Sequence, residues 1–201
     1  MVLGYRHPSA AEYEFLIRTT PDLDASAISD LIKGHTQYEL RRSMPKALKR
    51  NYRIETLQTR SLSQYTATVE LMMTTHSGDG VVDQTQKGWH GLYQNNFVFE
   101  FFVASRRRWN RTKLVAMVRG ACQKKRWSLA KVGCDEERLI VIAGVDLTTS
   151  PRDAGMSLMN NLAYAHDNRP VLADHWSVYS TGSHTLQQYR ESQPSFGQPT
   201  R

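Results

Sequence analysis

The stretch Leu139-Ile-Val-Ile-Ala-Gly-Val145 decides the fold class of this 201-residue chain. It is short, rich in β-branched residues and apolar at every position, which is typical of a strand buried in the middle of a sheet. It is also the longest apolar run in the sequence, well below the roughly 20 residues that a membrane-spanning helix needs. The sequence therefore predicts a fold built around a sheet, without a transmembrane segment.

The segments next to this strand predict more of the same sheet. Upstream, Asn96 to Ala104 (NFVFEFFVA) is apolar on both faces and predicts a second inner strand. Between the two strands, a helix is expected from Asn110 or Thr112 to about Lys124. Its apolar positions fall on one stripe, which consists of Leu114, Val115, Val118, Ala121 and Cys122. Downstream, residues 153–165 predict a helix and residues 176–180 a last strand.

The N-terminal half predicts two more helices. Asp24 can cap a helix from Ala25 to Lys33, with Gly34 as its end. Thr36-Gln-Tyr-Glu39 fits a capping box, in which the threonine hydroxyl and the glutamate satisfy free amides at a helix start. A second helix is therefore expected to begin there, with a kink or break before Pro45.

Three further strands are expected in the first half of the chain. Residues 13–18 alternate weakly, and residues 52–59 and 64–73 predict an antiparallel pair. In residues 64–73 the apolar and polar positions alternate over nine residues, which is the clearest strand pattern in the sequence. Residues 76–87 predict a polar loop.

Together these elements predict the α+β class: a mainly antiparallel sheet with helices packed on one face. We expect a single compact domain over residues 1–182 and a flexible polar tail over residues 183–201, which is rich in Ser, Gln, Pro and Gly. Glu12, Glu14, Asp22 and Asp24 and the absence of an apolar stretch exclude a secretory signal or transit peptide before residue 25. An intracellular location, in cytoplasm or nucleus, is therefore expected.

The distribution of charge is the most informative feature for function. The chain contains 26 Lys and Arg against 19 Asp and Glu, a net charge of +7. Ten of these cations, and no carboxylate, lie between Ser105 and Lys131, while residues 33–60 carry a smaller excess of cations. The rest of the chain is net acidic. Such concentrated positive potential attracts polyanions.

The basic segment of residues 105–131 predicts a nucleic-acid interface. Guanidinium groups bind phosphates, and a tryptophan at each end of the segment gives a flat face for an unpaired base. The candidate nucleic-acid-binding residues are Arg106, Arg107, Arg108, Trp109, Arg111, Lys113, Arg119, Lys124, Lys125, Arg126 and Trp127. The alternatives are that both tryptophans pack in the core, and that Lys124 to Arg126 compensate a helix dipole.

Catalytic signals are weak. His76 with His90, Asp79 and Asp83 would suit a nuclease, although a glycine-rich acidic loop is more often only a turn. Asp146 after the central strand is more often a strand-ending polar residue than a ligand. Two cysteines cannot form a disulfide framework or a zinc site, and Cys122 on the apolar stripe predicts a core residue.

The favoured hypothesis is a non-enzymatic nucleic-acid-binding protein, with RNA preferred over DNA and with no cofactor, metal site or catalytic residue. The alternative is a structural or assembly subunit, viral matrix-like or a complex scaffold, whose basic face lies on a genome or an acidic surface. A protein partner or self-association fits that alternative. A membrane surface ranks below nucleic acid, because the apolar stripe of residues 114–122 is needed for the core.

Overall fold

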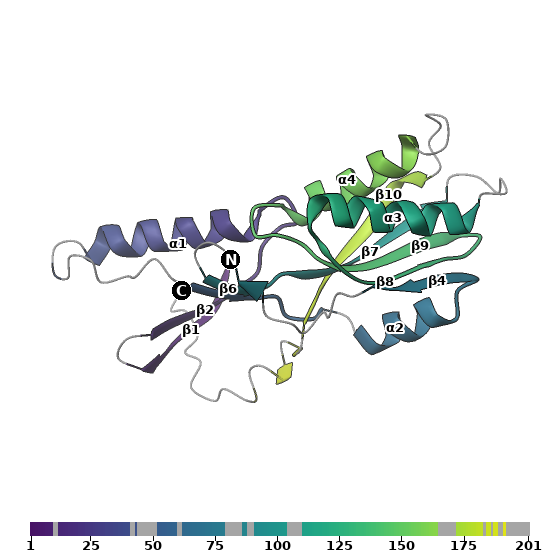
Figure 1. The fold of residues 1–201 in the computed structure, drawn as a ribbon. Coiled ribbons are helices and arrows are strands. Elements are labelled where there is room, and N and C mark those ends of the chain that lie inside the picture. The colour runs from purple at the N-terminus through teal and green to yellow at the C-terminus, as the bar shows by residue number, and fades with distance from the viewer. Residues whose placement is uncertain are drawn as a thin grey trace.

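The computed structural model of the chain describes residues 1–9, 12–40, 43, 52–59, 62–78, 86–87, 91–103, 110–164, 172–182, 184–185, 187–188 and 191. Its centre is a five-stranded antiparallel sheet with the strand order β10-β7-β9-β8-β4 (Figure 1). These strands are β4 (Thr74–Ser77), β7 (Asn96–Val103), β8 (Ser128–Cys134), β9 (Arg138–Gly144) and β10 (Leu172–Thr181). The predicted α+β class with a mainly antiparallel sheet is confirmed.

Four of these strands and two helices form one connected unit. Along the chain they run β7-α3-β8-β9-α4-β10, where α3 is Arg111–Lys125 and α4 is Pro151–Tyr164. This chain order with the sheet order β10-β7-β9-β8 is the split βαβ, or ferredoxin-like, arrangement. β4 adds a fifth strand beside β8, where a polar loop was expected.

One face of the sheet packs against α3 and α4 (Figure 1). Phe97, Phe99 and Phe101 of β7 lie opposite Ala143, Val141 and Leu139 of β9, so these six side chains share that face. The buried residues of α3 are the ones that its apolar stripe predicts: Leu114, Val115, Val118, Ala121 and Cys122. The periodicity of the sequence therefore identified this part of the core correctly.

The opposite face of the sheet is covered in part by α2 (Leu62–Glu70), so helices lie on both faces and not on one (Figure 1). The strand predicted for residues 64–73 is wrong. Val69 and the following Met72 pack against the sheet, whereas Leu71 and Met73 are 88% and 62% exposed. The buried positions follow a helical spacing that the alternation concealed.

A glycine in β8 lets this helix approach the sheet closely. A Cβ atom at Gly133 would lie 2.6 Å from the Met72 sulfur and 2.9 Å from Cγ1 of Val69. Any larger residue at position 133 would push α2 away from β8. The missing side chain at Gly133 therefore allows Val69 and Met72 to pack closely against β8.

The remaining elements come from the N-terminal half. β1 (Val2–Ser9) pairs with β2 (Glu12–Ile17), and a three-stranded sheet has the order β3-β6-β5. Its strands are β3 (Tyr52–Glu55), β5 (Gln86–Lys87) and β6 (Gly91–Gln94). Among the described residues, no helix combines the length and the apolar character that crossing a bilayer requires.

Helix α1 (Ala25–Leu40) begins where expected but does not end there. Asp24 Oδ1 accepts a 2.7 Å hydrogen bond from the Ala27 amide, which confirms the cap. The helix continues through Gly34, which lacks the positive φ of a left-handed helix end. The capping box predicted at Thr36 therefore lies inside α1 and is wrong. Residues 41–42 and 44–50, with Pro45, lie outside the described residues.

Two described residues of the expected C-terminal tail contact the rest of the chain. The Gln58 amide donates to the carbonyl of His184 over 2.9 Å, and Gln58 forms an isolated parallel bridge with Thr185. These contacts place the chain after β10 beside the segment that follows β3.

Candidate nucleic-acid interface

Helix α3 and its cap carry most of the described cations of the basic segment, and both ends of the helix are capped. Asn110 Oδ1 accepts a 3.0 Å hydrogen bond from the Lys113 amide at the start. At the end, Arg126 adopts φ 58° and its amide bonds to Gln123 O over 3.1 Å. The Trp127 amide bonds to Cys122 O over 2.9 Å, which completes a Schellman motif. The basic residues are thus held on a well-defined helix.

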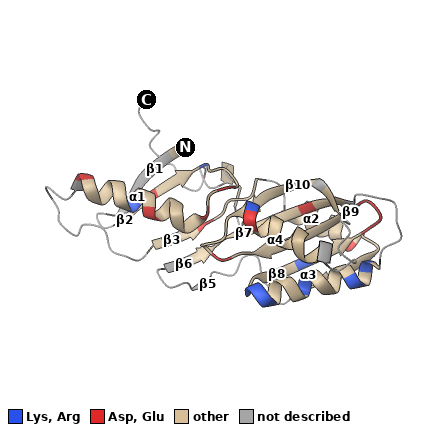
Figure 2. Ribbon diagram, turned by 90° about the horizontal axis from the view of Figure 1, so that it is seen from above, with Lys and Arg blue, Asp and Glu red and all other residues tan. Residues whose placement is uncertain are grey.

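The exposed face of α3 is cationic and has no carboxylate of its own. Lys113, Arg119, Lys124, Lys125 and Arg126 are all exposed. Figure 2 shows Lys and Arg at both ends of this helix, in contrast to the acidic residues on α1. At about 100° and 1.5 Å per residue, Lys113 and Lys124 lie on the same side of the helix, about 16 Å apart.

Small side chains separate these cations on the helix surface. By the same helix geometry, Ala116 and Gly120 lie between Arg119 on one side and the Lys113–Lys124 side on the other, and both are exposed. A Cβ atom at Gly120 would meet no atom within 4 Å. An extended polyanion can therefore approach the helix backbone and meet cations on both sides.

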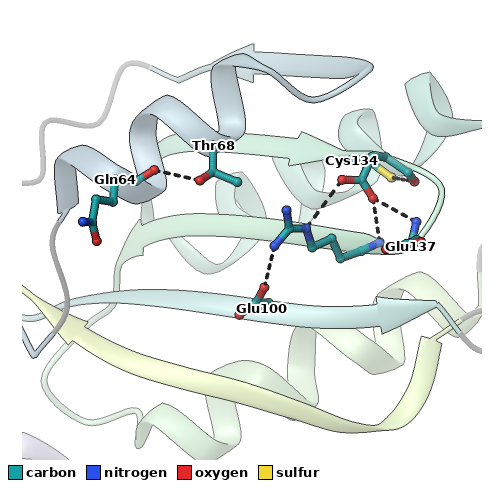
Figure 3. A network of polar contacts seen from close by, with 7 residues as sticks. Gln64, Thr68, Glu100, Cys134 and Glu137 are labelled. Atoms are coloured by element: carbon teal, nitrogen blue, oxygen red, sulfur yellow. Dashed lines mark hydrogen bonds and ion pairs between the residues drawn. The ribbon is translucent and has the colours of Figure 1, made fainter.

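Several cations elsewhere in the described structure pair with carboxylates. Arg138 bonds to Glu100 over 3.3 Å and to Asp135 over 3.5 Å on the face of the sheet that α2 covers (Figure 3). Arg152 pairs with Asp22 over 2.8 Å. In contrast, no ion pair joins Lys113, Arg119, Lys124, Lys125 or Arg126 to a carboxylate in the described part of the chain.

Two members of the basic segment are partly or wholly removed from this surface. Arg111 lies at the start of α3 and pairs with Glu136 over 3.9 Å. Lys131 projects from β8 toward α2 and pairs with Glu70, on the other face of the sheet. The exposed cations of the basic segment on this side of the sheet therefore end with α3 and its cap, because the chain turns into the sheet at residue 127.

Trp127 lies in the core and not on the surface. Its side chain is 6% exposed, packs in the cluster between α3, α4 and the sheet, and donates a 3.0 Å hydrogen bond from Nε1 to Asp146 Oδ2. The ring thus belongs to the core and is not an exposed stacking surface on α3, and the expectation that Trp127 stacks on nucleic acid at the surface of the basic segment is corrected. Core packing, the alternative weighed for both tryptophans, holds for this one.

Asp146 is a structural carboxylate at the end of β9. It accepts hydrogen bonds from the Thr148 amide and hydroxyl, from the Thr149 hydroxyl and from Trp127. Burial raises the pKa of Asp146, but these hydrogen bonds outweigh it and hold the pKa below its ordinary value of 3.8. The carboxylate fixes the loop between β9 and α4, as a strand-ending residue would.

The two thiols are both buried. Burial raises the pKa of Cys122 and of Cys134 to about 11, so both thiols stay protonated at neutral pH. Because the thiolate is the nucleophilic form, neither residue is poised for catalysis. This agrees with the expectation that Cys122 belongs to the core.

Several predicted site residues lie outside the described residues. They are Arg106, Arg107, Arg108 and Trp109 before α3, and Asp79, Asp83 and His90 after β4. The phosphate contacts of the three arginines, the stacking of Trp109 and the acid–base pair of His76 and His90 therefore stay predictions.

One further feature beside α3 has no counterpart in any sequence pattern. A hollow of about 240 Å³, here named the α3–β4 hollow, is lined by His76, Gly78, Arg119, Cys122, Gln123, Trp127, Ser128 and Leu129. These residues come from β4, α3, the α3 cap and β8, which are separated along the chain. No local sequence pattern contains these residues together, so the hollow forms only because β4, α3 and β8 pack against one another.

No protein-family model and no curated relative matches this chain. Among solved structures, it is similar to a REP-associated tyrosine transposase bound to a REP hairpin, with a TM-score of 0.37 and 8% sequence identity. The match covers 49% of this chain and 61% of the transposase chain, which is less than two thirds of that chain. A likeness at this level carries no argument about what this chain binds.

Proposed function

We propose that the protein binds nucleic acid, RNA in preference to DNA, through the exposed face of α3 and the arginines that precede it. One observation carries this proposal: Lys113, Arg119, Lys124, Lys125 and Arg126 are exposed together around one helix without a described carboxylate partner. A single exposed cation costs the protein little free energy. Cations that lie close together repel one another unless an anion lies nearby.

The position of the charges favours a phosphate backbone over a single small anion. Cations near both ends of α3 are separated by about 16 Å along the helix axis. A small anion would touch one end, whereas a polynucleotide meets several cations at once. Arg106 to Arg108 would extend the same track beyond the start of α3. RNA is favoured because single-stranded or structured RNA presents unpaired bases beside its phosphates.

The test is a salt titration of binding to single-stranded RNA, duplex RNA and duplex DNA. Replacing Lys113 and Lys124 together by Gln should weaken binding to all three. The slope of log affinity against log salt should fall by about 0.7 for each lost phosphate contact on a single strand. Lys131→Gln is the matched control, because it removes one charge of the same segment on the other face of the sheet.

Two outcomes separate the explanations. Weaker binding and a smaller slope for the double variant, with the control unchanged, support α3 as the interface. Equal binding of parent and double variant at physiological salt would refute it.

A second candidate function, the assembly subunit, has its own support. Leu71 and Met73 are 88% and 62% exposed and directly precede β4, the last strand in the sheet order. Exposed apolar side chains beside an edge strand are typical of a protein contact. Sedimentation of the parent and of a Leu71→Ser, Met73→Ser variant tests this: a self-associating parent and a monomeric variant support it, and a monomeric parent contradicts self-association.

A further inference from the structure

The α3–β4 hollow lies directly beside the cationic face of α3, and the two share Arg119. Its volume of about 240 Å³ is below the roughly 300–1,000 Å³ of pockets that enclose a drug-sized ligand. It therefore has room for one small planar ring and not for a base pair.

The register of the sheet explains how the hollow forms. His76 of β4 lies opposite Val132 of β8, and Val132 belongs to the core beneath α3, so the imidazole shares the α3 side of the sheet. Gly78 then brings the end of β4 against β8: its amide bonds to Ala130 O over 2.9 Å, and a Cβ there would lie 2.1 Å from Leu129 O. β4 thus forms one wall and α3 the other.

The lining combines polar walls with an apolar base. Arg119, Gln123, Ser128 and His76 provide a guanidinium, a carboxamide, a hydroxyl and an imidazole, while Cys122, Trp127 and Leu129 are buried and apolar apart from a protonated thiol. The side chains of Arg119, Gln123 and His76 form no hydrogen bond or ion pair with another described residue. Their donors and acceptors are therefore open to a ligand.

The chemistry of these groups selects among ligand classes. None of the lining residues is a carboxylate, so a cationic ligand has no counter-charge there. A nucleobase suits the site, because its faces are apolar and its edge carries donors and acceptors that carboxamide, hydroxyl and imidazole groups can bind. The guanidinium of Arg119 would meet the phosphate attached to that nucleotide.

We propose that the α3–β4 hollow binds one unpaired nucleobase of a single strand whose phosphates lie along α3. This inference rests on the proposed function and deepens it, because it names the substrate class as single-stranded nucleic acid. A base held in a duplex cannot enter without unpairing, which costs free energy. The protein should therefore prefer a single strand to a duplex of the same charge.

The experiment compares a short RNA strand that contains all four bases with an abasic strand of the same length. The two strands carry the same phosphates and differ only in their bases. The parent protein should bind the strand with bases roughly tenfold more tightly, because a base contact of this kind is worth about a factor of ten. The dependence on salt should be the same for both strands.

Three substitutions locate the effect. Ser128→Leu fills the hollow without changing charge and should remove the tenfold preference. Ser77→Leu makes the same substitution at an exposed position of β4 outside the hollow, opposite Lys131 on the face of the sheet away from α3, and should keep the preference. Gln123→Leu gives a second test at an exposed position of α3, where folding is insensitive, and should also reduce the preference. Thermal melting of each variant confirms that it is folded.

The outcomes distinguish this inference from the proposed function. If the parent binds the abasic strand as tightly as the strand with bases, α3 binds phosphates only and the hollow is not a base site. If the preference survives in both Ser128→Leu and Gln123→Leu, the base binds elsewhere. If neither strand binds to the parent, the proposed function itself fails.

Discussion

The indole Nε1 of Trp127 donates a 3.0 Å hydrogen bond to Oδ2 of Asp146, and this bond ties the end of α3 to the loop that leads into α4. The basic helix is therefore held against the sheet at its C-terminal end by a residue that, on charge and position alone, looked like part of the nucleic-acid surface. Substitutions of Trp127 and Asp146 can therefore separate the contribution of this bond to stability from its contribution to nucleic-acid binding.

The Trp127–Asp146 bond should contribute to stability and not to binding. Trp127→Phe keeps an aromatic ring and removes the donor, so it should cost about 1 kcal/mol of unfolding free energy. Asp146→Ala removes the acceptor of several bonds at once and should cost about 3 kcal/mol. Urea denaturation measures both. Loss of nucleic-acid affinity in a fully folded Trp127→Phe protein would show that this hydrogen bond also contributes to binding.

The same carboxylate predicts an acid-dependent loss of stability. Because the pKa of Asp146 is lower in the folded protein than its ordinary value of 3.8, its contribution is fully present above that value. The contribution is lost as the pH falls through the folded pKa. The stability difference between the parent and Asp146→Asn should therefore be constant near neutral pH and shrink below pH 3.8. A difference that stays constant down to acid-induced unfolding would contradict the assignment.

Arg126 has a left-handed backbone, with φ 58°, at a position where glycine is the usual residue. Arg126→Gly should therefore raise the unfolding free energy by about 1 kcal/mol, while the lost charge weakens binding to RNA. Lys125→Gly is the matched control: it removes the same charge from the last helical turn but should lower stability. Denaturation and a salt titration measure the two effects. Equal stability changes for both variants would show that the backbone at position 126 carries no strain.

The start of α1 provides a test of its cap. Asp24→Ala removes the acceptor of the Ala27 amide and should cost about 1 kcal/mol. Thr36→Ala lies inside the helix, where alanine has the higher propensity, and should leave stability unchanged or raise it by a few tenths of a kcal/mol. Thermal melting of the two variants decides. A larger loss for Thr36→Ala would mean that a helix begins at residue 36 after all.

Both thiols should resist modification in the folded protein. With pKa values of about 11, Cys122 and Cys134 are protonated at neutral pH, and their burial excludes reagents as well. An aromatic disulfide reagent should therefore label neither residue until the protein is unfolded with urea. Rapid labelling of the native protein at neutral pH would indicate that α3 opens away from the sheet.

Local pattern alone determined the elements with one consistent period. Leu139–Val145 is a continuous apolar run, Asn96–Ala104 carries apolar residues on both faces, and the apolar positions of α3 and its Asn110 cap agree with a helix. Such segments have one structure that buries their apolar side chains, so no tertiary contact is needed to choose between alternatives. The positive charge of the basic segment is likewise a property of the sequence, because no residue of 105–131 is acidic.

Tertiary contacts decided the segments whose pattern fits two structures or none. Residues 64–73 fit a strand and a helix, and the space left by Gly133 under Val69 and Met72 selects the helix. In β8 a register shift between Leu129 and Lys131 breaks the alternation of side chains between the two faces. The local sequence pattern therefore does not predict this strand. Its pairing with β9 and β4 forms it nonetheless.

The features of the candidate site likewise divide into those that the sequence predicts and those that only the tertiary structure decides. The sequence identified the cations of α3, because charge density can be read residue by residue. It left open whether Trp127 lies in the core, and it could not separate Lys131 from the helix or bring His76 to Arg119. Each of these depends on which side of the sheet a residue faces, and that is set by strand register and by the close packing of helices on both faces, neither of which is encoded in a single segment.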